Sequence, residues 1–110
     1  MKVLLFNGSP KAKGCTFTAL SEVAKTLEEN GVEAEIIHIG GNVLGGCKGC
    51  GFCGKTGKCV TEDVLNQVMD KVKGADGYVF GSPVHYASAS GDITSFLDRL
   101  FITCGSAMAY

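Results

Sequence analysis

The chain has 110 residues, of which 45% are hydrophobic and 19% are charged, and its formal net charge is −1. This length and composition are typical of one globular domain and exclude a disordered tail. The near-neutral charge, with no basic run between aromatic residues, argues against a nucleic-acid partner. The apolar run at residues 3–6 is too short for a signal-peptide core or a membrane span. We therefore expect a cytoplasmic protein with no membrane partner.

Apolar segments of strand type alternate along the chain with segments whose apolar residues recur at helical spacing. Strands are predicted over residues 2–6, 32–39 and 78–81. Helices are predicted over residues 16–30, from a cap at Thr61 to residue 74, and from residue 90 through an apolar stripe that ends at residue 101, whereas residues 103–110 show no clear period. The alternation indicates a single α/β domain, residues 1–110, with a parallel sheet in the strand order 2-1-3. In such a sheet, ligands bind beyond the carboxyl ends of the first and third strands.

Residues 7–18, NGSPKAKGCTFT, join the first predicted strand to the first helix. The glycines permit close backbone approach, and the N–H groups at the start of the helix are free to bind an anion. Hydroxyls of Ser9 and Thr16 and the charge of Lys11 suit a phosphate monoester. The loop is not of the Walker A type, because Cys15 stands where the lysine would be. The alternative interpretation is a well-capped turn that binds nothing.

Four of the six cysteines lie in the glycine-rich segment 45–59, with the spacing C-x2-C-x2-C-x5-C. Cys47, Cys50, Cys53 and Cys59 supply enough thiolates for one closed tetrahedral site. The first three repeat at x2 intervals, as in loops that hold iron–sulfur cubanes, whereas zinc prefers two separated C-x2-C pairs. A reducing compartment favours metal ligands or redox groups over structural disulfides. An iron–sulfur centre is the leading hypothesis, with zinc, disulfides or free thiols as alternatives.

The third loop, residues 81–91, reads GSPVHYASASG and follows the third predicted strand. His85 and Tyr86 can reach a flat aromatic ligand there, and residues 83–86 offer backbone groups to its polar edge. The alternatives are a solvated histidine and a surface aromatic residue. The sequence has no Ser/His/Asp order and no paired carboxylates, so it identifies no catalytic residue. Asp98 and Arg99 are expected to form a polar bridge or a helix-end anchor.

The motifs NGSPKAKGCT, CKGCGFCGKTGKC and GSPVHYASASG followed by FLDRLF resemble the flavodoxin-like superfamily. Within it, the chain is similar to the NAD(P)H-dependent FMN reductases and the iron–sulfur flavoproteins, over essentially its whole length. The resemblance implies a three-layer sandwich and an FMN-dependent oxidoreductase or electron carrier, with NAD(P)H or a ferredoxin-type donor. It assigns the FMN phosphate to Ser9, Lys11, Cys15, Thr16 and Phe17, the isoalloxazine ring to Pro83, Val84, His85 and Tyr86, and a [4Fe-4S] cluster to Cys47, Cys50, Cys53 and Cys59.

The chain departs from this family pattern in two ways. Cys15 stands where the family often has asparagine, which removes one polar contact to the phosphate. The fourth and fifth strands of the family fold are absent, so we expect the N-terminal part of that fold, with the third strand as an open apolar edge. Such an edge invites pairing, which predicts a homo-oligomer beside a small-molecule or protein redox partner. The alternative functions are a non-enzymatic metal-stapled module and an inactive remnant.

Overall fold

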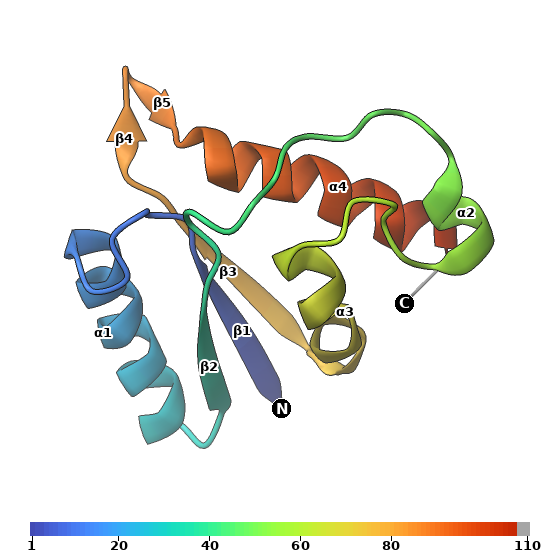
Figure 1. Ribbon diagram of the computed structural model, residues 1–110. Helices are drawn as coiled ribbons and strands as arrows, with labels where there is room; N and C mark the ends of the chain where they lie inside the picture. The colour runs from blue at the N-terminus through green and yellow to red at the C-terminus, as the bar shows by residue number, and fades with distance from the viewer. Residues whose placement is uncertain (108–110) are drawn as a thin grey trace.

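The computed structural model describes residues 1–107, which form an α/β arrangement around a small sheet (Figure 1). None of the helices in this described part is both long and apolar enough to cross a membrane. The elements in chain order are β1 (Lys2–Asn7), α1 (Cys15–Glu29), β2 (Glu33–His38), α2 (Phe52–Thr56), α3 (Val64–Gly74), β3 (Gly77–Gly81), β4 (Val84–His85), β5 (Ser88–Ala89) and α4 (Gly91–Ala107).

The main sheet has the order β2-β1-β3, and both pairings are parallel. Leu4 of the central strand lies opposite Glu35 on β2 and Tyr78 on β3. The central strand carries the apolar run Leu4–Leu5–Phe6, and all three side chains are fully buried. A continuous apolar run is typical of a parallel strand that is covered on both faces. The predicted α/β class and the strand order 2-1-3 are confirmed.

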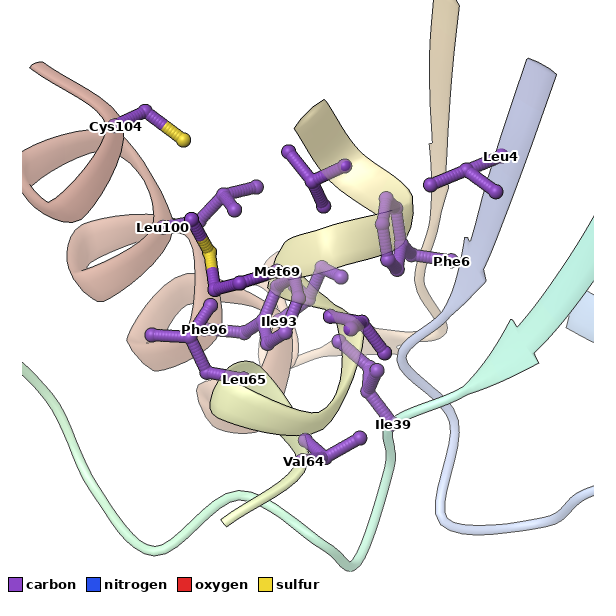
Figure 2. Close-up of a cluster of buried hydrophobic side chains, with 12 residues drawn as sticks. Leu4, Phe6, Ile39, Val64, Leu65, Met69, Ile93, Phe96, Leu100 and Cys104 are labelled. Atoms are coloured by element: carbon purple, nitrogen blue, oxygen red, sulfur yellow. The ribbon is translucent and has the colours of Figure 1, made fainter. Parts of the chain in front are cut away.

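Helices cover both faces of the sheet, so the domain has three layers (Figure 1). On one face α1 packs against β1, β2 and β3. On the other face Leu4 and Phe6 join the main hydrophobic core, to which α3 and α4 contribute most of the other side chains (Figure 2). The Phe6 ring stacks on Phe80 at a centroid distance of 5.3 Å and contacts Phe96 at 5.2 Å. These aromatic contacts fix α4 across β1 and β3.

The start of α3 differs from the prediction. The helix begins at Val64, and its cap is Asp63, whose Oδ1 accepts a hydrogen bond from the Leu65 N–H at 3.1 Å. The sequence predicted Thr61 as the cap, which is wrong by two residues. A carboxylate is favoured at this position because it accepts from a free N–H and lies at the positive end of the helix dipole.

A small hairpin follows β3 where the sequence analysis predicted a continuous loop. Val84 pairs with Ala89 and His85 with Ser88, in antiparallel orientation. The two residues of the turn have positive φ, +50° at Tyr86 and +65° at Ala87. Two-residue hairpin turns of this type need positive φ at both central positions and usually have Asn or Gly there. Neither residue at the turn is of that type, so the sequence carried no hairpin signal.

Candidate functional site

An open pocket of about 280 Å³ lies beyond the carboxyl ends of β1 and β3. The loop after β1 and the loop after β3 both line it, so the two motifs that sequence analysis singled out face one space. Two of the predicted site residues, Phe17 and Tyr86, are not among the lining residues, and Tyr86 is fully exposed at the turn of the hairpin. The lining consists of Ser9, Pro10, Lys11, Gly14, Cys15, Thr16, Pro83, Val84 and His85.

The shape of the first loop depends on Asn7, the buried last residue of β1. Its Oδ1 accepts from the Ser9 N–H at 3.0 Å, and its Nδ2 donates to the Ala12 carbonyl at 3.3 Å. Ser9 Oγ in turn accepts from the Lys11 N–H at 3.1 Å, and His38 Nε2 lies 2.8 Å from the Ser9 carbonyl oxygen. Sequence reasoning missed Asn7, although a polar residue at the end of an apolar strand is a usable signal.

The N-terminus of α1 points to anion binding. Its cap is Gly14, and no side chain caps the helix. The Thr18 N–H makes the first intrahelical bond, to the Gly14 carbonyl at 3.1 Å. The N–H groups of the first turn precede that bond and are oriented toward the start of the helix, where the dipole is positive. With Lys11 and Thr16 at the same pocket, this geometry suits a phosphate group.

Hydrogen bonds hold the two loops against each other. The Gly8 N–H donates to the Gly81 carbonyl at 2.8 Å, and Ser90 Oγ donates to the Gly8 carbonyl at 3.1 Å. The Ser90 N–H donates to Ser82 Oγ at 2.8 Å. A Cβ on Gly8 would lie 2.8 Å from the Cβ of Ile93, so this close approach requires glycine. The two loops that line the pocket are therefore fixed against each other and against the start of α4.

A second cavity, of about 200 Å³, gathers the cysteine segment at the other end of α4. Cys47, Cys50, Cys53 and Cys59 all line it, and Arg99, Ile102 and Thr103 line it from α4. Cys47 and Cys50 are exposed, Cys53 is buried and Cys59 is half-buried, and all four thiols are free. No set of three or more His, Cys, Asp or Glu side chains in residues 1–107 is placed to hold a metal ion. The four thiols share a cavity without forming a ready-made ion site.

A one-turn helix, α2, positions the third cysteine. Gly51 before it and Gly57 after it both have φ of +76°, which reverses the chain at each end. The helix packs against the C-terminal part of α4 (Figure 1). Cys53 Sγ faces that helix and lies 3.9 Å from the Ile102 carbonyl oxygen. Sequence analysis did not predict α2, because five residues with an internal glycine show no helical period.

Asn66 of α3 positions the fourth cysteine. Its Oδ1 accepts from the Cys59 N–H at 2.9 Å, and its Nδ2 donates to the Cys59 carbonyl at 2.9 Å. One amide side chain therefore satisfies both backbone groups of Cys59, as a neighbouring strand would do. Sequence reasoning did not select Asn66, because nothing in the sequence relates a helix surface asparagine to a loop seven residues earlier.

A buried ion pair between Asp63 and Arg99 lies where the two ends of the cysteine segment meet. Arg99 Nη2 lies 2.5 Å from Asp63 Oδ1, and Arg99 Nη1 lies 2.7 Å from Asp63 Oδ2, with 1% and 3% of the side chains exposed. Arg99 also donates to the Gly45 carbonyl at 2.9 Å and to the Thr61 carbonyl at 3.4 Å, one on each side of the cysteines. Arg99 was expected to form a polar bridge or anchor with Asp98, but its carboxylate partner is Asp63.

Two buried donors beside the cysteines have no acceptor. Arg99 Nε and Thr103 Oγ1 are buried and find no hydrogen-bond partner among the described residues. Both residues line the cavity that the cysteines line. The Asp63 carboxylate and, after it, the Cys59 sulfur raise the pKa of the Arg99 guanidinium above its ordinary value. The cavity thus combines four thiols with a permanent positive charge and unused donors.

The two cavities share no lining residue. The loop after β3 lines the first and leads into the start of α4. Ser90, just before the helix, makes hydrogen bonds to the two loops of the first cavity. Arg99, Ile102 and Thr103 of α4 line the second cavity. At 1.5 Å per residue, these positions are separated by roughly 13–20 Å along the helix axis. From the sequence, the cysteine segment was expected after the second strand and beside the FMN crevice, whereas in the structure it lies against the C-terminal part of α4 and lines a separate cavity.

The parallel sheet, its strand order and the pocket at its carboxyl edge define an α/β protein of the flavodoxin-like class. The chain matches the sequence model of the NADPH-dependent FMN reductases over residues 1–109 and belongs to that family. It is 35% identical over 99 residues to an iron-sulfur flavoprotein of Methanocaldococcus jannaschii, a match that covers 90% of this chain and 51% of the relative.

Two further relatives agree with this assignment. An iron-sulfur flavoprotein of Archaeoglobus fulgidus is 36% identical over 99 residues, which are 90% of this chain and 48% of the relative. One from Methanosarcina thermophila is 31% identical over 102 residues, which are 90% of this chain and 52% of the relative. The chain therefore spans about half the length of the curated relatives it matches.

Proposed function

We propose that the chain is a cytoplasmic redox protein that binds FMN in the pocket between the loops after β1 and β3. One observation carries the proposal: both loops line a single pocket at the point where the strand order reverses, in a member of the FMN reductase family. The phosphate would bind at the start of α1, with Ser9, Lys11, Cys15 and Thr16. The ring would lie along Pro83, Val84 and His85.

The cysteine cavity fits an iron–sulfur cluster in its chemistry. Four free thiols supply the ligands, and they share the cavity with Arg99, whose charge is already paired with Asp63. The unpartnered donors match a group whose sulfur atoms accept hydrogen bonds. We propose that Cys47, Cys50, Cys53 and Cys59 hold a [4Fe-4S] cluster.

In this function the chain provides position and electrostatics, while the cofactors provide the redox chemistry. FMN held between the loops after β1 and β3 would supply electron exchange with NAD(P)H or a ferredoxin-type donor, and a cluster held by the four cysteines would supply one-electron transfer. The open side of the FMN pocket is the place for a nicotinamide or another small electron donor. A protein partner is the alternative donor or acceptor.

The decisive experiment is anaerobic purification or reconstitution, followed by a visible spectrum and assays of FMN, iron, sulfide and zinc. We expect about one FMN per chain and iron with equimolar sulfide. Zinc alone would favour the metal-stapled module and contradict the redox function. A colourless chain that takes up neither flavin nor metal would indicate an inactive remnant.

The phosphate contact is tested by Thr16→Ala, which removes a hydroxyl from the pocket. A hydrogen bond to a charged group contributes about 1.5 kcal/mol or more, so we expect FMN to bind about tenfold more weakly. Thr16→Ser should retain the affinity. Thr26→Ala is the matched control, because Thr26 lies on the same helix but bonds to the Glu22 carbonyl, away from the pocket. Fluorescence titration of FMN measures all three, and equal affinity of Thr16→Ala and wild type would refute the contact.

A further inference from the structure

The two unpartnered donors beside the cysteines, Arg99 Nε and Thr103 Oγ1, call for an acceptor. The exposed fractions are 1% for Arg99 and 0% for Thr103, so bulk water does not reach them. Most buried polar groups in folded proteins have a hydrogen-bond partner, and each exception needs a physical explanation. Both exceptions found in the described chain lie on one turn of α4, four residues apart, on the helix face that lines the cysteine cavity.

The other donors of Arg99 are already used inside the protein. Its two terminal nitrogens bind both oxygens of Asp63 and the carbonyls at either side of the cysteine segment. This network fixes the guanidinium plane and leaves only the Nε–H free. Arg99 and Cys59 line the same cavity. The spare donor therefore belongs to a residue that shares this space with the cysteines.

Thr103 has no such network. A threonine hydroxyl within a helix usually donates to the carbonyl four residues earlier, as Thr94 does to Ser90 at 3.0 Å on the same helix. Thr103 Oγ1 makes no such bond among the described residues, although it is fully buried. A hydroxyl that bonds neither to its own helix nor to a neighbour is available to a group in the cavity.

We propose that Arg99 Nε–H and Thr103 Oγ1–H donate hydrogen bonds to sulfur of the group held by the four cysteines and thereby set its reduction potential. This inference rests on the proposed cluster and goes beyond it, because it assigns a role to two residues that are not ligands. The sulfur atoms are cysteine thiolate or inorganic sulfide, and both accept hydrogen bonds.

The sign of the effect follows from charge. Reduction adds one negative charge to the group, and a hydrogen-bond donor stabilises the more negative state. Removing a donor should therefore make reduction harder and lower the midpoint potential. The charge of Arg99 acts in the same direction, but any change at Arg99 also breaks the ion pair with Asp63. Thr103 is the cleaner position to test.

The experiment uses Thr103→Val, which replaces the hydroxyl by a methyl group of nearly the same shape. We expect the reduction equilibrium constant of the loaded protein to fall about tenfold, which is about 59 mV for one electron. Thr103→Ser keeps a donor and should stay near the wild-type potential. Thr94→Val is the matched control on the same helix, outside the cavity, and should not change the potential.

A second measurement separates this role from a structural one. In the metal-free chain the Thr103 hydroxyl has no partner, so Thr103→Val should leave the urea midpoint of unfolding unchanged or higher. A lower midpoint would show that the hydroxyl serves the fold, which would overturn the inference.

The remaining outcomes distinguish the two proposals. Normal iron and sulfide in Thr103→Val, with an unchanged potential, would overturn the inference and leave the cluster assignment intact. A wild-type chain that takes up no iron or sulfide would overturn the cluster assignment, and with it the inference.

Discussion

Asp63 is the residue through which distant parts of the chain meet. Its two oxygens accept from the Leu44 and Leu65 N–H groups and from both terminal nitrogens of Arg99. The carboxylate thus caps α3, ties down the start of the cysteine segment and anchors α4. A buried ion pair of this kind contributes modestly to net stability, but losing one partner leaves the other charge uncompensated.

We predict that Asp63→Asn strongly destabilises the domain at neutral pH. The substitution leaves a buried guanidinium without its counter-charge, which costs about 3–5 kcal/mol in comparable buried pairs. Urea unfolding followed by circular dichroism measures the loss. Asp70→Asn is the matched control, because Asp70 lies on the same helix with an exposed side chain. We expect that control to change the free energy of unfolding by less than about 0.5 kcal/mol.

The same variant should reveal a pH dependence. Burial by itself would raise the pKa of Asp63, but hydrogen bonds from Arg99, Leu44 and Leu65 outweigh it and hold the pKa below its ordinary 3.8. A carboxyl whose pKa is lower in the folded state stabilises above the unfolded pKa and loses that contribution as pH falls through the folded pKa. The gap between wild type and Asp63→Asn should therefore be constant above about pH 5 and narrow below pH 3.8. A constant gap down to pH 2 would contradict this assignment.

Among the elements, the β4–β5 hairpin carries local strain. Tyr86 and Ala87 both adopt the left-handed region, where a Cβ is unfavourable. We predict that Ala87→Gly stabilises the domain by about 1 kcal/mol, because glycine adopts this conformation without the steric cost. Thermal or urea unfolding measures the gain.

The matched control for this prediction is Ala89→Gly, two residues further along. Ala89 is a strand residue of β5, and the structure gives it no positive φ. Glycine there adds chain entropy to the unfolded state and should destabilise by about 0.5–1 kcal/mol. We expect the two substitutions to change the free energy of unfolding in opposite directions. Destabilisation by both would show that the turn is not strained at Ala87.

The elements that the sequence predicted well are those with a periodic apolar pattern. The run at β1 and the stripes of α1, α3 and α4 identified the layers and the strand order, because each must bury one face. The hairpin strands have two residues each, and α2 has five, so neither shows a period. The cap at Asp63 was missed because Thr61, two residues earlier, is also an acceptable cap by residue type.

The sequence identified the motifs that line the two cavities, but not the residues that hold those motifs in place. The glycine, serine and cysteine motifs follow from local spacing, and the structure gathers most of them around two cavities. The contact between Asp63 and Arg99 spans 36 positions. The relation of Thr103 to the cysteines likewise depends on how α4 crosses the domain. Local sequence patterns carry no information about such contacts.

At the scale of the whole molecule, β3 is an open edge of the main sheet. Phe101 of α4 lies beside it, with 58% of the residue exposed and its ring 6.5 Å from that of Phe80. An apolar edge of this kind favours pairing with another chain. We predict that the isolated chain forms dimers or larger assemblies of itself.

Sedimentation velocity over a range of concentrations tests this prediction. Phe101→Ser should shift the distribution toward monomer by removing apolar surface next to the edge. Leu44→Ser is the matched control, because Leu44 is an exposed apolar side chain in the loop after β2 and belongs to neither β3 nor α4. A monodisperse wild-type monomer would rule out the association.

The Asp63–Arg99 pair also bears on the order in which the cysteine segment is organised. Its contacts with Gly45 and Thr61 bring together the ends of a loop of about 17 residues without the use of any cysteine. Closing a flexible loop of that length costs on the order of 2.5 kcal/mol in chain entropy. The free energy of folding of the domain, and not that of metal binding, offsets this loss of chain entropy. If the four cysteines hold the proposed cluster, a chain stripped of it would keep its thiols gathered and could be reloaded without refolding.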